Sequence, residues 1–549
     1  MSDPTPTTAG TTRAAEPGSA RTPGQHPEQF SYLSHKQILV VLFGVMSGML
    51  LAALDQSIVG TALPRIVGDL GGLNQYSWVV TAYLLTSTAV TPLWGKVSDL
   101  YGRRLIFQIS ITIFLIGSAL SGASQNMIEL IGFRALQGIG GGGLFSIALA
   151  IIGDVIPPRE RGRYQGYFGA VFGVSSVAGP LLGGWLTDGP GWRWIFYINL
   201  PIGIAALFVT SMALKMPVVR RNHAIDYAGA AAIMTSVTSL LLYLNWSGGS
   251  YGWFAPLSLA LLTGFLVLAA VFVWVESRAS EPIIPLRLFQ IRTYSVGNVY
   301  GFLSGFAMFG AMIFLPLYLQ AVKGMSPTIS GLAMVPTVIG LFSASIGSGQ
   351  LMTRTGHYRI FPILGALIMT GSLVLMSQIS ATIAYWHLAG EMFMFGFGLG
   401  LTMQTIVTAV QNAVTMRDMG TATSSTTFFR QLGAAIGTAV FGAVLSARLT
   451  HYLAAAFAGG PALPSTGAGA GANLADSVQR IQALPAPVKA KVVGAFSSAI
   501  GDVFLVGVPF LVIAFVVALL LKEVPLRTAQ SHGARGPGDE ELVEPTGLI

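Results

Sequence analysis

Residues 38–60 read ILVVLFGVMSGMLLAALDQSIVG, and Asp55 is the single charged side chain among them. A bilayer has a hydrocarbon core about 30 Å thick, which a helix crosses with roughly 20 apolar residues. Within lipid, only helices and closed barrels satisfy the hydrogen-bonding groups of their own backbone. This stretch therefore predicts a membrane-spanning helix, and it decides the fold class of the chain.

Thirteen further runs of this kind follow along the chain. Because spans in series pack as a helical bundle, we expect an all-α integral membrane protein with 14 transmembrane helices. The further spans are predicted near residues 76–97, 105–123, 129–152, 165–187, 194–214, 227–247, 254–275, 295–320, 328–352, 359–378, 385–411, 424–446 and 501–521.

The amino-acid composition excludes several classes of protein. Of 549 residues, 53% are hydrophobic and 9% are charged, whereas soluble domains carry about 25% charged residues. A soluble enzyme, a disordered protein and a nucleic-acid binder are therefore excluded. The chain has no cysteine, and its seven histidines do not cluster with other metal ligands in the sequence. We therefore expect neither a metal site nor an enzyme.

The basic residues predict which side of the membrane each loop faces, because Lys and Arg are enriched in cytoplasmic loops. With the N-terminus inside, 21 basic residues fall on the inner side and 7 on the outer side, and four of those 7 share one long loop. The net charge of +8 is therefore mostly a topology signal. An even number of spans then places both termini in the cytoplasm, with the protein multi-pass in the cell membrane.

A short pattern occurs twice, at equivalent helix ends. Residues 95–104 read GKVSDLYGRR after the second span, and residues 349–359 read GQLMTRTGHYR after the tenth. Each holds two glycines separated by six residues, and the offset of 254 residues corresponds to six spans plus two. The pattern predicts two six-helix halves, and such repeats around a midplane site are typical of secondary transporters.

This repeat sets the predicted domain organisation. The segments are a disordered cytoplasmic tail at 1–35, an N-terminal six-helix half at 36–216, two central helices at 217–280, a C-terminal six-helix half at 281–523 and a cytoplasmic tail at 524–549. Within the C-terminal half, residues 447–499 are expected to form an outer loop that contains a surface helix near 486–498.

Six sequence motifs point to one family. They are GKVSDLYGRR at 95–104, LDQSIVGTALP at 54–64, RALQGIG at 134–140, Gly173 with GPLLGG at 179–184, WRWIFYINLP at 192–201 and FRQLG at 429–433. Together they resemble the major facilitator superfamily and, within it, the fourteen-span drug:proton antiporter branch. The resemblance runs from about residue 38 to residue 521. It implies that fold, the export of drugs in exchange for protons, and a role for Arg134 in proton coupling.

Asp55 is the first candidate for that coupling. It lies about two-thirds along the first span, where an ionisable side chain costs about 2.5–3.5 kcal/mol on insertion scales and by default suggests function. Burial favours the neutral form of a carboxylate, so Asp55 could carry a proton or face a cationic substrate. The alternative is a structural hydrogen bond to neighbouring helix ends.

Arg134 and Gln137 share one face of the fourth span. In the family reading, the fixed charge of Arg134 stabilises a nearby ionised carboxylate. The alternatives are that Arg134 holds backbone carbonyls or extends to the outer surface.

Glu391 in the twelfth span is a further acidic candidate. It either lines the substrate cavity or lies near the outer interface.

Two secondary candidates lie near helix ends. Asp226 begins the seventh span, where capping of the helix is favoured over proton coupling. Arg430 lies toward the inner end of the thirteenth span, with Gln431 and Gln411 as candidate companions. For Arg430, anchoring of the helix end is favoured over a role in coupling like that considered for Arg134.

Charged residues at the predicted cytoplasmic mouth suggest a conformational latch. Asp99 and Arg103 follow the second span, and Asp154 ends the fourth. The positive-inside rule explains the arginine but neither carboxylate. We therefore predict a latch that is intact when the protein opens outward and broken when it opens inward.

In the fifth span, Gly179 and Pro180 interrupt the helical hydrogen bonds and predict a bend or gating hinge.

The glycine-rich run at 138–143 invites comparison with a phosphate-binding loop. It lacks the Lys-Ser or Lys-Thr pair of such a loop and lies within a predicted membrane helix, so close helix packing explains it better. No Walker motif occurs elsewhere in the chain. We therefore expect no cofactor, and a proton gradient as the source of energy.

The predicted function is multidrug efflux by secondary active transport, as in antibiotic resistance. The protein would export hydrophobic small molecules, cationic ones in particular, by proton antiport with alternating access. The expected partners are small lipophilic or cationic substrates, protons and membrane lipids, with no nucleic acid; a periplasmic adaptor at the outer loop stays open. The alternatives are a dedicated carrier of this fold for one metabolite, siderophore, lipid or nutrient, and a membrane sensor without transport.

Overall fold

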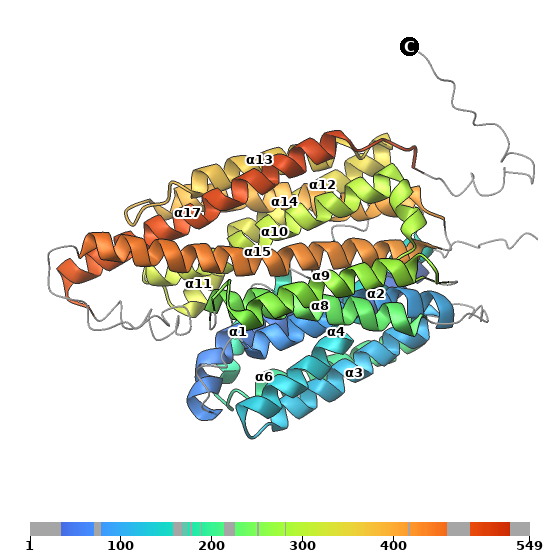
Figure 1. Ribbon diagram of the computed structural model, residues 1–549, viewed down its shortest axis with the longest axis horizontal. Coiled ribbons are helices and arrows are strands. Elements are labelled where there is room, and N and C mark those ends of the chain that lie inside the picture. The colour runs from blue at the N-terminus through green and yellow to red at the C-terminus, as the bar shows by residue number, and fades with distance from the viewer. Residues whose placement is uncertain are drawn as a thin grey trace, which may run out of the picture.

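The computed structural model describes residues 35–70, 78–156, 189–213, 226–249, 252–279, 282–415, 418–457 and 484–526, together with single residues and short runs between 167 and 187. Every regular element in these ranges is a helix. The helices lie side by side along one long direction of the molecule (Figure 1). The all-helical fold class is therefore confirmed.

The N-terminal group of helices is built around α4. Helix α4 packs against α1, α2 and α3, while α7 packs against α1 and α3. The group consists of α1 (His35–Leu70), α2 (Trp78–Tyr101), α3 (Arg103–Ala123), α4 (Met127–Val155), the short α6 (Trp194–Tyr197) and α7 (Asn199–Ala213).

The C-terminal group forms a second body, drawn above the first in Figure 1. Helix α14 packs against α12 and α13, and α10 packs against α15 and α17. The group consists of α10 (Arg292–Ala321), α11 (Pro327–Ala333), α12 (Val335–Thr355), α13 (Ile360–Met376), α14 (Tyr385–Ala413), α15 (Met419–Ala456) and α17 (Ala486–Leu519).

Two central helices lie between these groups in the sequence and contact both in space. Helix α8 (Tyr227–Gly249) packs against α9 (Pro256–Glu276), and it also contacts α2 of the first group and α15 of the second. The short 3₁₀-helix η2 (Leu286–Gln290) then leads into α10. The central pair therefore bridges the two groups along one side.

The helices agree with the predicted spans. Ten helices in the described part of the chain are long and apolar enough to cross a membrane. Helices α2, α8 and α13 occupy the second, seventh and eleventh predicted ranges, whereas most of the fifth, 165–187, lies outside the described residues. A membrane-spanning helical fold is confirmed, and the count of fourteen stays a prediction.

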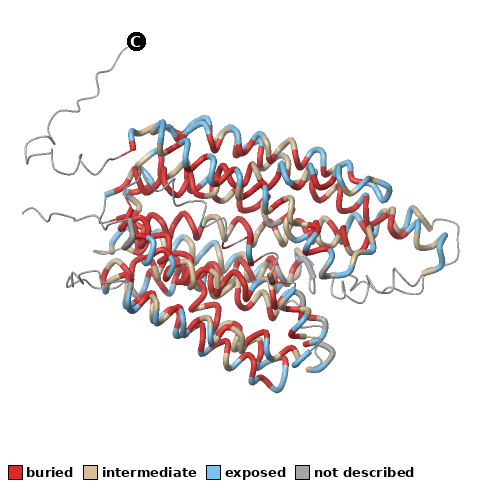
Figure 2. The backbone as a smooth tube through the Cα atoms, turned by 180° about the vertical axis from the view of Figure 1, so that it is seen from behind, coloured by how far each residue is buried: buried red, intermediate tan, exposed pale blue. Residues whose placement is uncertain are grey.

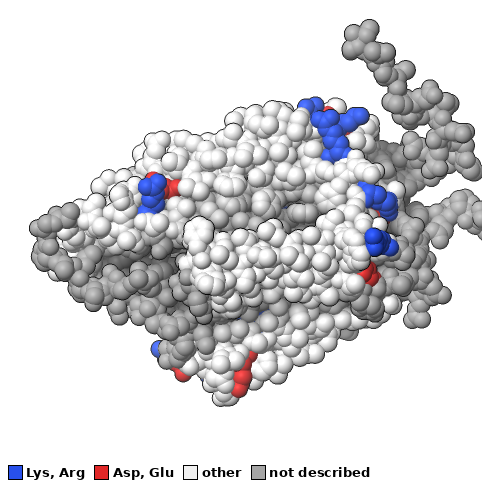
Figure 3. All heavy atoms as spheres, viewed as in Figure 1, with Lys and Arg blue, Asp and Glu red and all other residues white. Residues whose placement is uncertain are grey.

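The outer surface of the bundle is apolar, the reverse of a soluble protein. Helix α9 buries only Ser258 and Glu276, so nearly all of its apolar side chains face outward. Exposed positions lie along the outside of the bundle (Figure 2), and charged side chains on the face in Figure 3 gather mainly at its ends. Exposure of such an apolar surface to water would be unfavourable, whereas contact with lipid is not.

Basic side chains share one end of the bundle. We call this the inner end, after the predicted orientation, and the opposite end the outer end; α2 ends and α3 begins at the inner end. It lies at the right in Figures 1 and 3. Five exposed arginines from the central and C-terminal segments lie there: Arg278, Arg287, Arg292, Arg354 and Arg359.

Glycines allow α4 to approach its neighbours closely. A Cβ at Gly138 would overlap the backbone oxygen of Tyr83 on α2, and one at Gly140 would overlap the backbone nitrogen of Phe114 on α3. Small residues at such interfaces are the usual means by which membrane helices pack. Helix packing therefore accounts for the glycine-rich run, as the sequence indicated.

The predicted outer loop at 447–499 is shorter than expected. Helix α15 continues to Ala456, and α17 already begins at Ala486, so the predicted surface helix near 486–498 and the last span form one helix. The extensions are helical because their apolar side chains join the core of the C-terminal group: Leu449, Val492, Val493 and Phe496 are buried in it. The predicted loop segment is therefore helical at both of its ends, and its place outside the membrane stays a prediction.

Candidate functional site

A buried ion pair lies inside the N-terminal group. The carboxylate of Asp55 on α1 accepts a hydrogen bond of 2.6 Å from the guanidinium of Arg134 on α4. The side chains are 0% and 1% exposed. A buried charge is costly unless it is paired and hydrogen-bonded, so each of these residues accounts for the presence of the other. The structure therefore brings together the two main candidates of the sequence.

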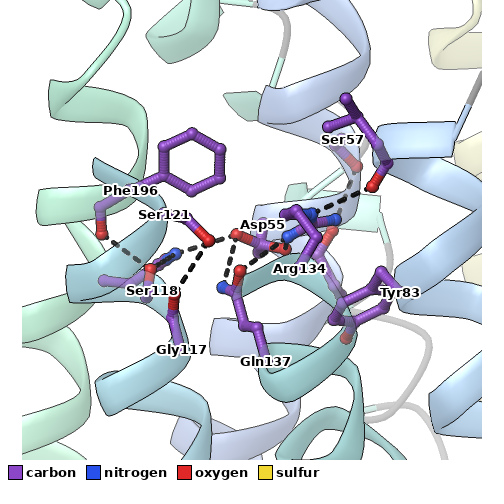
Figure 4. A network of polar contacts seen from close by, with 12 residues as sticks. Asp55, Ser57, Tyr83, Gly117, Ser118, Ser121, Arg134, Gln137 and Phe196 are labelled. Atoms are coloured by element: carbon purple, nitrogen blue, oxygen red, sulfur yellow. Dashed lines mark hydrogen bonds and ion pairs between the residues drawn. The ribbon is translucent and has the colours of Figure 1, made fainter. Parts of the chain in front are cut away.

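Two amide side chains complete the coordination of Asp55 (Figure 4). Gln137 on α4 and Asn199, the first residue of α7, donate to Asp55 Oδ1 at 3.0 Å and 2.9 Å. Gln137 also accepts a 2.8 Å hydrogen bond from Arg134 through its own side-chain oxygen. Asp55 thus accepts three hydrogen bonds from two further helices, which offset the removal of its carboxylate from water.

The network continues into α3. Asn199 donates to the hydroxyl of Ser118 at 3.0 Å, and that hydroxyl donates to the backbone oxygen of Phe196 at 2.9 Å. A Cβ at Gly117 would lie 2.5 Å from the backbone nitrogen of Gln137, so a glycine is needed for α3 to approach α4 here. The polar network therefore ties α1, α3, α4 and α7 together at one level of the bundle.

Arg134 has further contacts on the side away from Asp55. Its Nε donates to the backbone oxygen of Val79 on α2 at 3.3 Å. The guanidinium carbon lies 4.4 Å from the ring centre of Tyr83 and 5.9 Å from that of Phe196. These contacts are of the cation–π type and stabilise a desolvated cation. Arg134 would therefore remain held if Asp55 were neutralised.

This arrangement has a clear chemical capacity. Protonation of Asp55 removes the ion pair with Arg134 and leaves the three donors without an anionic acceptor. Because these donors come from α4 and α7, protonation of Asp55 would weaken the hydrogen bonds that join α1 to both helices. Asp55 is moreover buried and fully hydrogen-bonded, so a cationic substrate has no access to it in this conformation. The geometry fits a proton carrier better than a substrate contact.

A second charged cluster lies at the inner end. Arg103, at the start of α3, forms ion pairs with Asp99 at the end of α2 and, at 2.7 Å, with Asp154 at the end of α4. It also donates to the Ser98 hydroxyl at 2.6 Å. The three residues predicted as a latch are therefore in direct contact, and they tie together the inner ends of three helices.

Asp99 also connects the two groups of helices. Its Oδ2 accepts hydrogen bonds from the backbone nitrogen and the hydroxyl of Thr421, at 3.0 Å and 3.1 Å. Thr421 is the third residue of α15, where backbone N–H groups have no partner within the helix and carry partial positive charge. Asp99 on one group therefore caps the N-terminus of a helix on the other.

Close contacts on both sides of this cap show that the inner end is closed. A Cβ at Gly420 would overlap Asp99 and Arg103, and a Cβ at Gly95 would overlap the side chain of Ser424. The two helix groups thus pack closely at Gly95 and Gly420, where any larger side chain would overlap the neighbouring group. Two further hydrogen bonds cross the same interface: Thr91 donates to Gln431 at 3.2 Å, and Gln411 donates to the backbone oxygen of Leu149 at 3.2 Å.

The remaining predicted acids lie apart from the Asp55 network. Glu391 on α14 is half-buried, and its backbone oxygen accepts a 2.7 Å hydrogen bond from Ser372 on α13, within the C-terminal group. Its Oε2 is buried without a hydrogen-bond partner among the described residues. Asp226 precedes α8 and accepts a 2.8 Å hydrogen bond from the backbone nitrogen of Gly229. Asp226 therefore caps the helix, the role that the sequence favoured.

The predicted hinge at Gly179 and the secondary candidate Arg430 both lie outside the Asp55 network. A Cβ at Gly179 would overlap the side chain of Ser57 on α1, so the fifth span contacts α1 closely there; Pro180 lies outside the described residues. Arg430 lies on α15 against Gly301 and Gly305 of α10, in the C-terminal group. Its candidate companions Gln431 and Gln411 bond to other residues, as described above.

Sequence reasoning missed several members of these clusters. Asn199 and Ser118 are uncharged, and their roles are revealed only by the hydrogen bond from Asn199 to Asp55 and the one from Asn199 to Ser118. A polar residue within an apolar helix was the available signal for both. Thr421 carried no signal, because it contributes its backbone N–H, which every residue except proline has. Its role depends on the approach of two helices far apart in sequence.

The comparison with known proteins agrees with this fold. A model of the Major Facilitator Superfamily matches residues 45–438. The chain belongs to this superfamily. It is therefore a multi-pass membrane transporter of small molecules and not an enzyme, as predicted. The assignment to the fourteen-span branch stays a prediction.

Relatives of similar length bear transporter names. The chain is 37% identical to the multidrug transporter protein MdtP of Bacillus subtilis, over 90% of this chain and 94% of that protein. It is 37% identical to multidrug resistance protein 3 of the same organism, over 89% and 96%. An uncharacterized MFS-type transporter of Mycobacterium tuberculosis is 42% identical, over 89% of this chain and 70% of the relative.

A solved structure shares the fold. The human organic anion transporter MFSD10 superposes with a TM-score of 0.56, covering 86% of this chain and 99% of that one. The two sequences are 16% identical, so the likeness concerns the arrangement of the helices alone.

Proposed function

We propose that this transporter exports hydrophobic small molecules, lipophilic cations among them, in exchange for protons. The observation that carries the proposal is the buried Asp55–Arg134 ion pair. An ionisable pair inside a membrane helix bundle is costly and by default suggests function. A carboxylate that gains and loses a proton there changes the charge of the network on each cycle. Asp55 is thus the proton carrier, and Arg134 and Gln137 position it.

The inner end supplies the conformational half of the mechanism. With the Asp99–Thr421 contact made, access from the inner side is blocked at the interface between the helix groups. Breaking the Asp99, Arg103 and Asp154 latch would let the two groups separate there. Alternating access then follows as the two groups rock about the central site, which is the usual scheme for repeat-built transporters.

Two considerations support export driven by protons. Two of the relatives bear multidrug names, which makes multidrug efflux the first function to test. The driving force is sufficient for an uncharged substrate, because one proton that moves across 100 mV releases about 2.3 kcal/mol, enough for roughly a 50-fold substrate gradient. For a monovalent cation, one-for-one exchange moves no net charge, and the pH difference supplies the driving force. In this proposal the protein lies in the cell membrane with both termini in the cytoplasm.

Uptake into inside-out vesicles tests the proposal. Vesicles with an acidic lumen would accumulate a fluorescent lipophilic cation, and a protonophore would abolish the accumulation. Asp55→Asn should remove the coupled uptake. Because that change leaves Arg134 buried without an anion, the double variant Asp55→Asn/Arg134→Gln should be measured beside it. Asp69→Asn is a matched control, since Asp69 lies on the same helix but is exposed.

The alternatives give different results in the same assay. A dedicated carrier would ignore the general cation but would transport one metabolite with narrow competition. A sensor would bind ligand saturably without any flux in reconstituted liposomes. Proton-dependent uptake at the wild-type rate by the Asp55→Asn variant would overturn the assignment of Asp55.

A further inference from the structure

Arg430 is a cation without a counterion among the described residues. It lies on α15, and its side chain is half-buried. Within the described part of the chain, its guanidinium takes part in no hydrogen bond and no ion pair. A guanidinium has five N–H donors and stays protonated in proteins. A cation inside a membrane helix bundle normally has a partner, so Arg430 has unfilled donor capacity.

Unsatisfied polar atoms lie nearby, where α10 meets α15. Asn298 on α10 is 2% exposed, yet among the described residues neither its amide nitrogen nor its amide oxygen has a hydrogen-bond partner. The hydroxyl of Tyr294, one turn before Asn298 on α10, is also buried without a hydrogen-bond partner among the described residues. More than about 90% of buried polar groups in proteins are hydrogen-bonded. Two side chains with unpaired polar atoms, Asn298 and Tyr294, at one seam therefore indicate a ligand or water that binds between the two helices.

The helix contacts place Arg430 and Asn298 on the same seam. A Cβ at Gly305 of α10 would lie 3.1 Å from Cγ of Arg430, and one at Gly301 would lie 4.0 Å from its Cβ. Asn298 is three residues before Gly301, on the same face of α10. Side chains of a helix tilt toward its N-terminus. For Arg430 this direction leads toward the inner end, which is also the direction from Gly301 to Asn298.

This seam borders the interface between the two helix groups. The residue after Arg430 is Gln431, whose side-chain oxygen accepts the 3.2 Å hydrogen bond from Thr91 on α2. A substrate that binds between the groups would therefore meet α15 beside Arg430. On the opposite side, Asp55 is saturated by Arg134, Gln137 and Asn199. Of the two charges Asp55 and Arg430, the one that remains available for recognition beside this interface is thus the positive one.

We propose that Arg430 and Asn298 form a subsite for the acidic group of an amphiphilic substrate, such as a carboxylate. The guanidinium donates to the anion, and the Asn298 amide adds a donor from α10. The transported class then includes zwitterionic and anionic amphiphiles in addition to cations. This inference rests on the proposed function, because it assumes that the protein moves hydrophobic small molecules.

A matched pair of dyes tests the subsite. Rhodamine B carries a free carboxylate, whereas its ethyl ester has the same ring system and lacks that charge. Uptake of each dye into energised inside-out vesicles gives a KM for the acid and for the ester. The variants are Arg430→Gln, Arg430→Lys and Asn298→Leu, with Arg354→Gln as the control, because Arg354 is exposed at the inner end.

We expect Arg430→Gln to raise the KM of the acid at least roughly tenfold more than that of the ester, since a hydrogen bond to a charged group contributes about 1.5–3 kcal/mol. Asn298→Leu should change the ratio in the same direction. Arg430→Lys should fall between, because it keeps the charge and loses the planar fork. Arg354→Gln should leave the ratio unchanged.

The failures of the two proposals can be told apart. If the wild type moves the ester but not the acid, or if Arg430→Gln changes both KM values equally, the subsite is wrong and the export proposal stands. If the wild type moves neither dye nor any other amphiphile, the export proposal itself fails. Should Arg430→Gln not fold, the ratio measured with Asn298→Leu decides between the outcomes.

Discussion

Asp55 and Arg134 lie on different helices, α1 and α4, and meet at 2.6 Å where both side chains are almost completely buried. They are 79 residues apart in sequence. The two charges depend on each other, because burial of either alone is costly. The two groups differ in how they can lose their charge. A carboxylate becomes neutral when it takes up a proton, whereas a guanidinium stays protonated in proteins.

This difference predicts the order of stability of three variants. Arg134→Gln leaves Asp55 free to take up a proton, whereas Asp55→Asn leaves a buried cation. We expect Asp55→Asn to lose the most stability, up to about 3–5 kcal/mol, and the double variant to recover part of that loss. Thermal unfolding of the detergent-solubilised protein measures the order. Equal losses that add in the double variant would show that the charges do not interact.

The parts of this site that the sequence revealed share one property. Asp55, Arg134 and Gln137 are polar residues in otherwise apolar spans, so depth in the membrane and the motif marked them before any contact was known. Asp99, Arg103 and Asp154 were found because two carboxylates stood where only basic residues were expected. Their contacts could be predicted, since all three lie at the same ends of consecutive spans.

The parts that the sequence did not reveal depend on distance across the fold. Asn199 joins Asp55 from α7, and Thr421 meets Asp99 through its backbone, 322 residues away. Glu391 was a candidate beside Asp55 because it is an acidic residue within a predicted span, but it lies in the other helix group beside α13. The ends of α15 and α17 were misjudged because polar residues such as Arg448 and Lys489 end the apolar runs that predict a span, whereas the helices continue past them.

The cap between Asp99 and Thr421 predicts how the inner end responds to mutation. Asp99→Asn loses the ion pair with Arg103 and weakens the cap, so the inner end should open more often. A cysteine at Ser424, in the closed interface, reports the opening. The wild-type chain has no cysteine, so a single engineered thiol is labelled without background. We expect Asp99→Asn to raise the labelling rate by an impermeant maleimide in inside-out vesicles about tenfold.

A cysteine at the exposed Arg354 position is the control for reagent access. It should be labelled at the same rate in the wild-type background and in the Asp99→Asn background. If the thiol at position 424 reacts equally fast in both backgrounds, the Asp99–Thr421 contact does not hold the inner end closed.

The glycines at this interface predict a steric effect separate from charge. Gly95→Ala would overlap Ser424, and Gly420→Ala would overlap Asp99 and Arg103. Either change should prevent full closure and lower the transport rate roughly tenfold or more, as expected when a clash of about 1–3 kcal/mol opposes one state of the cycle. Initial rates of dye uptake in vesicles, normalised to the amount of folded protein, give the comparison.

Gly371→Ala is the matched control, because α13 offers open space at that position. Alanine is also a better helix former than glycine, so this variant should transport normally and unfold at an equal or higher temperature. Normal transport by Gly95→Ala would show that the closed inner end is not part of the cycle.

The central claim is that Asp55 exchanges protons for substrate, and one measurement addresses it most directly. The purified protein is reconstituted in liposomes that contain a pH-sensitive dye, and an outward substrate gradient is imposed with no initial pH difference. The account predicts that substrate efflux drives protons inward and acidifies the lumen, and that this signal is lost with Asp55→Asn and with Asp55→Asn/Arg134→Gln but kept with Asp69→Asn. Acidification by the Asp55→Asn variant at the wild-type rate would contradict the account.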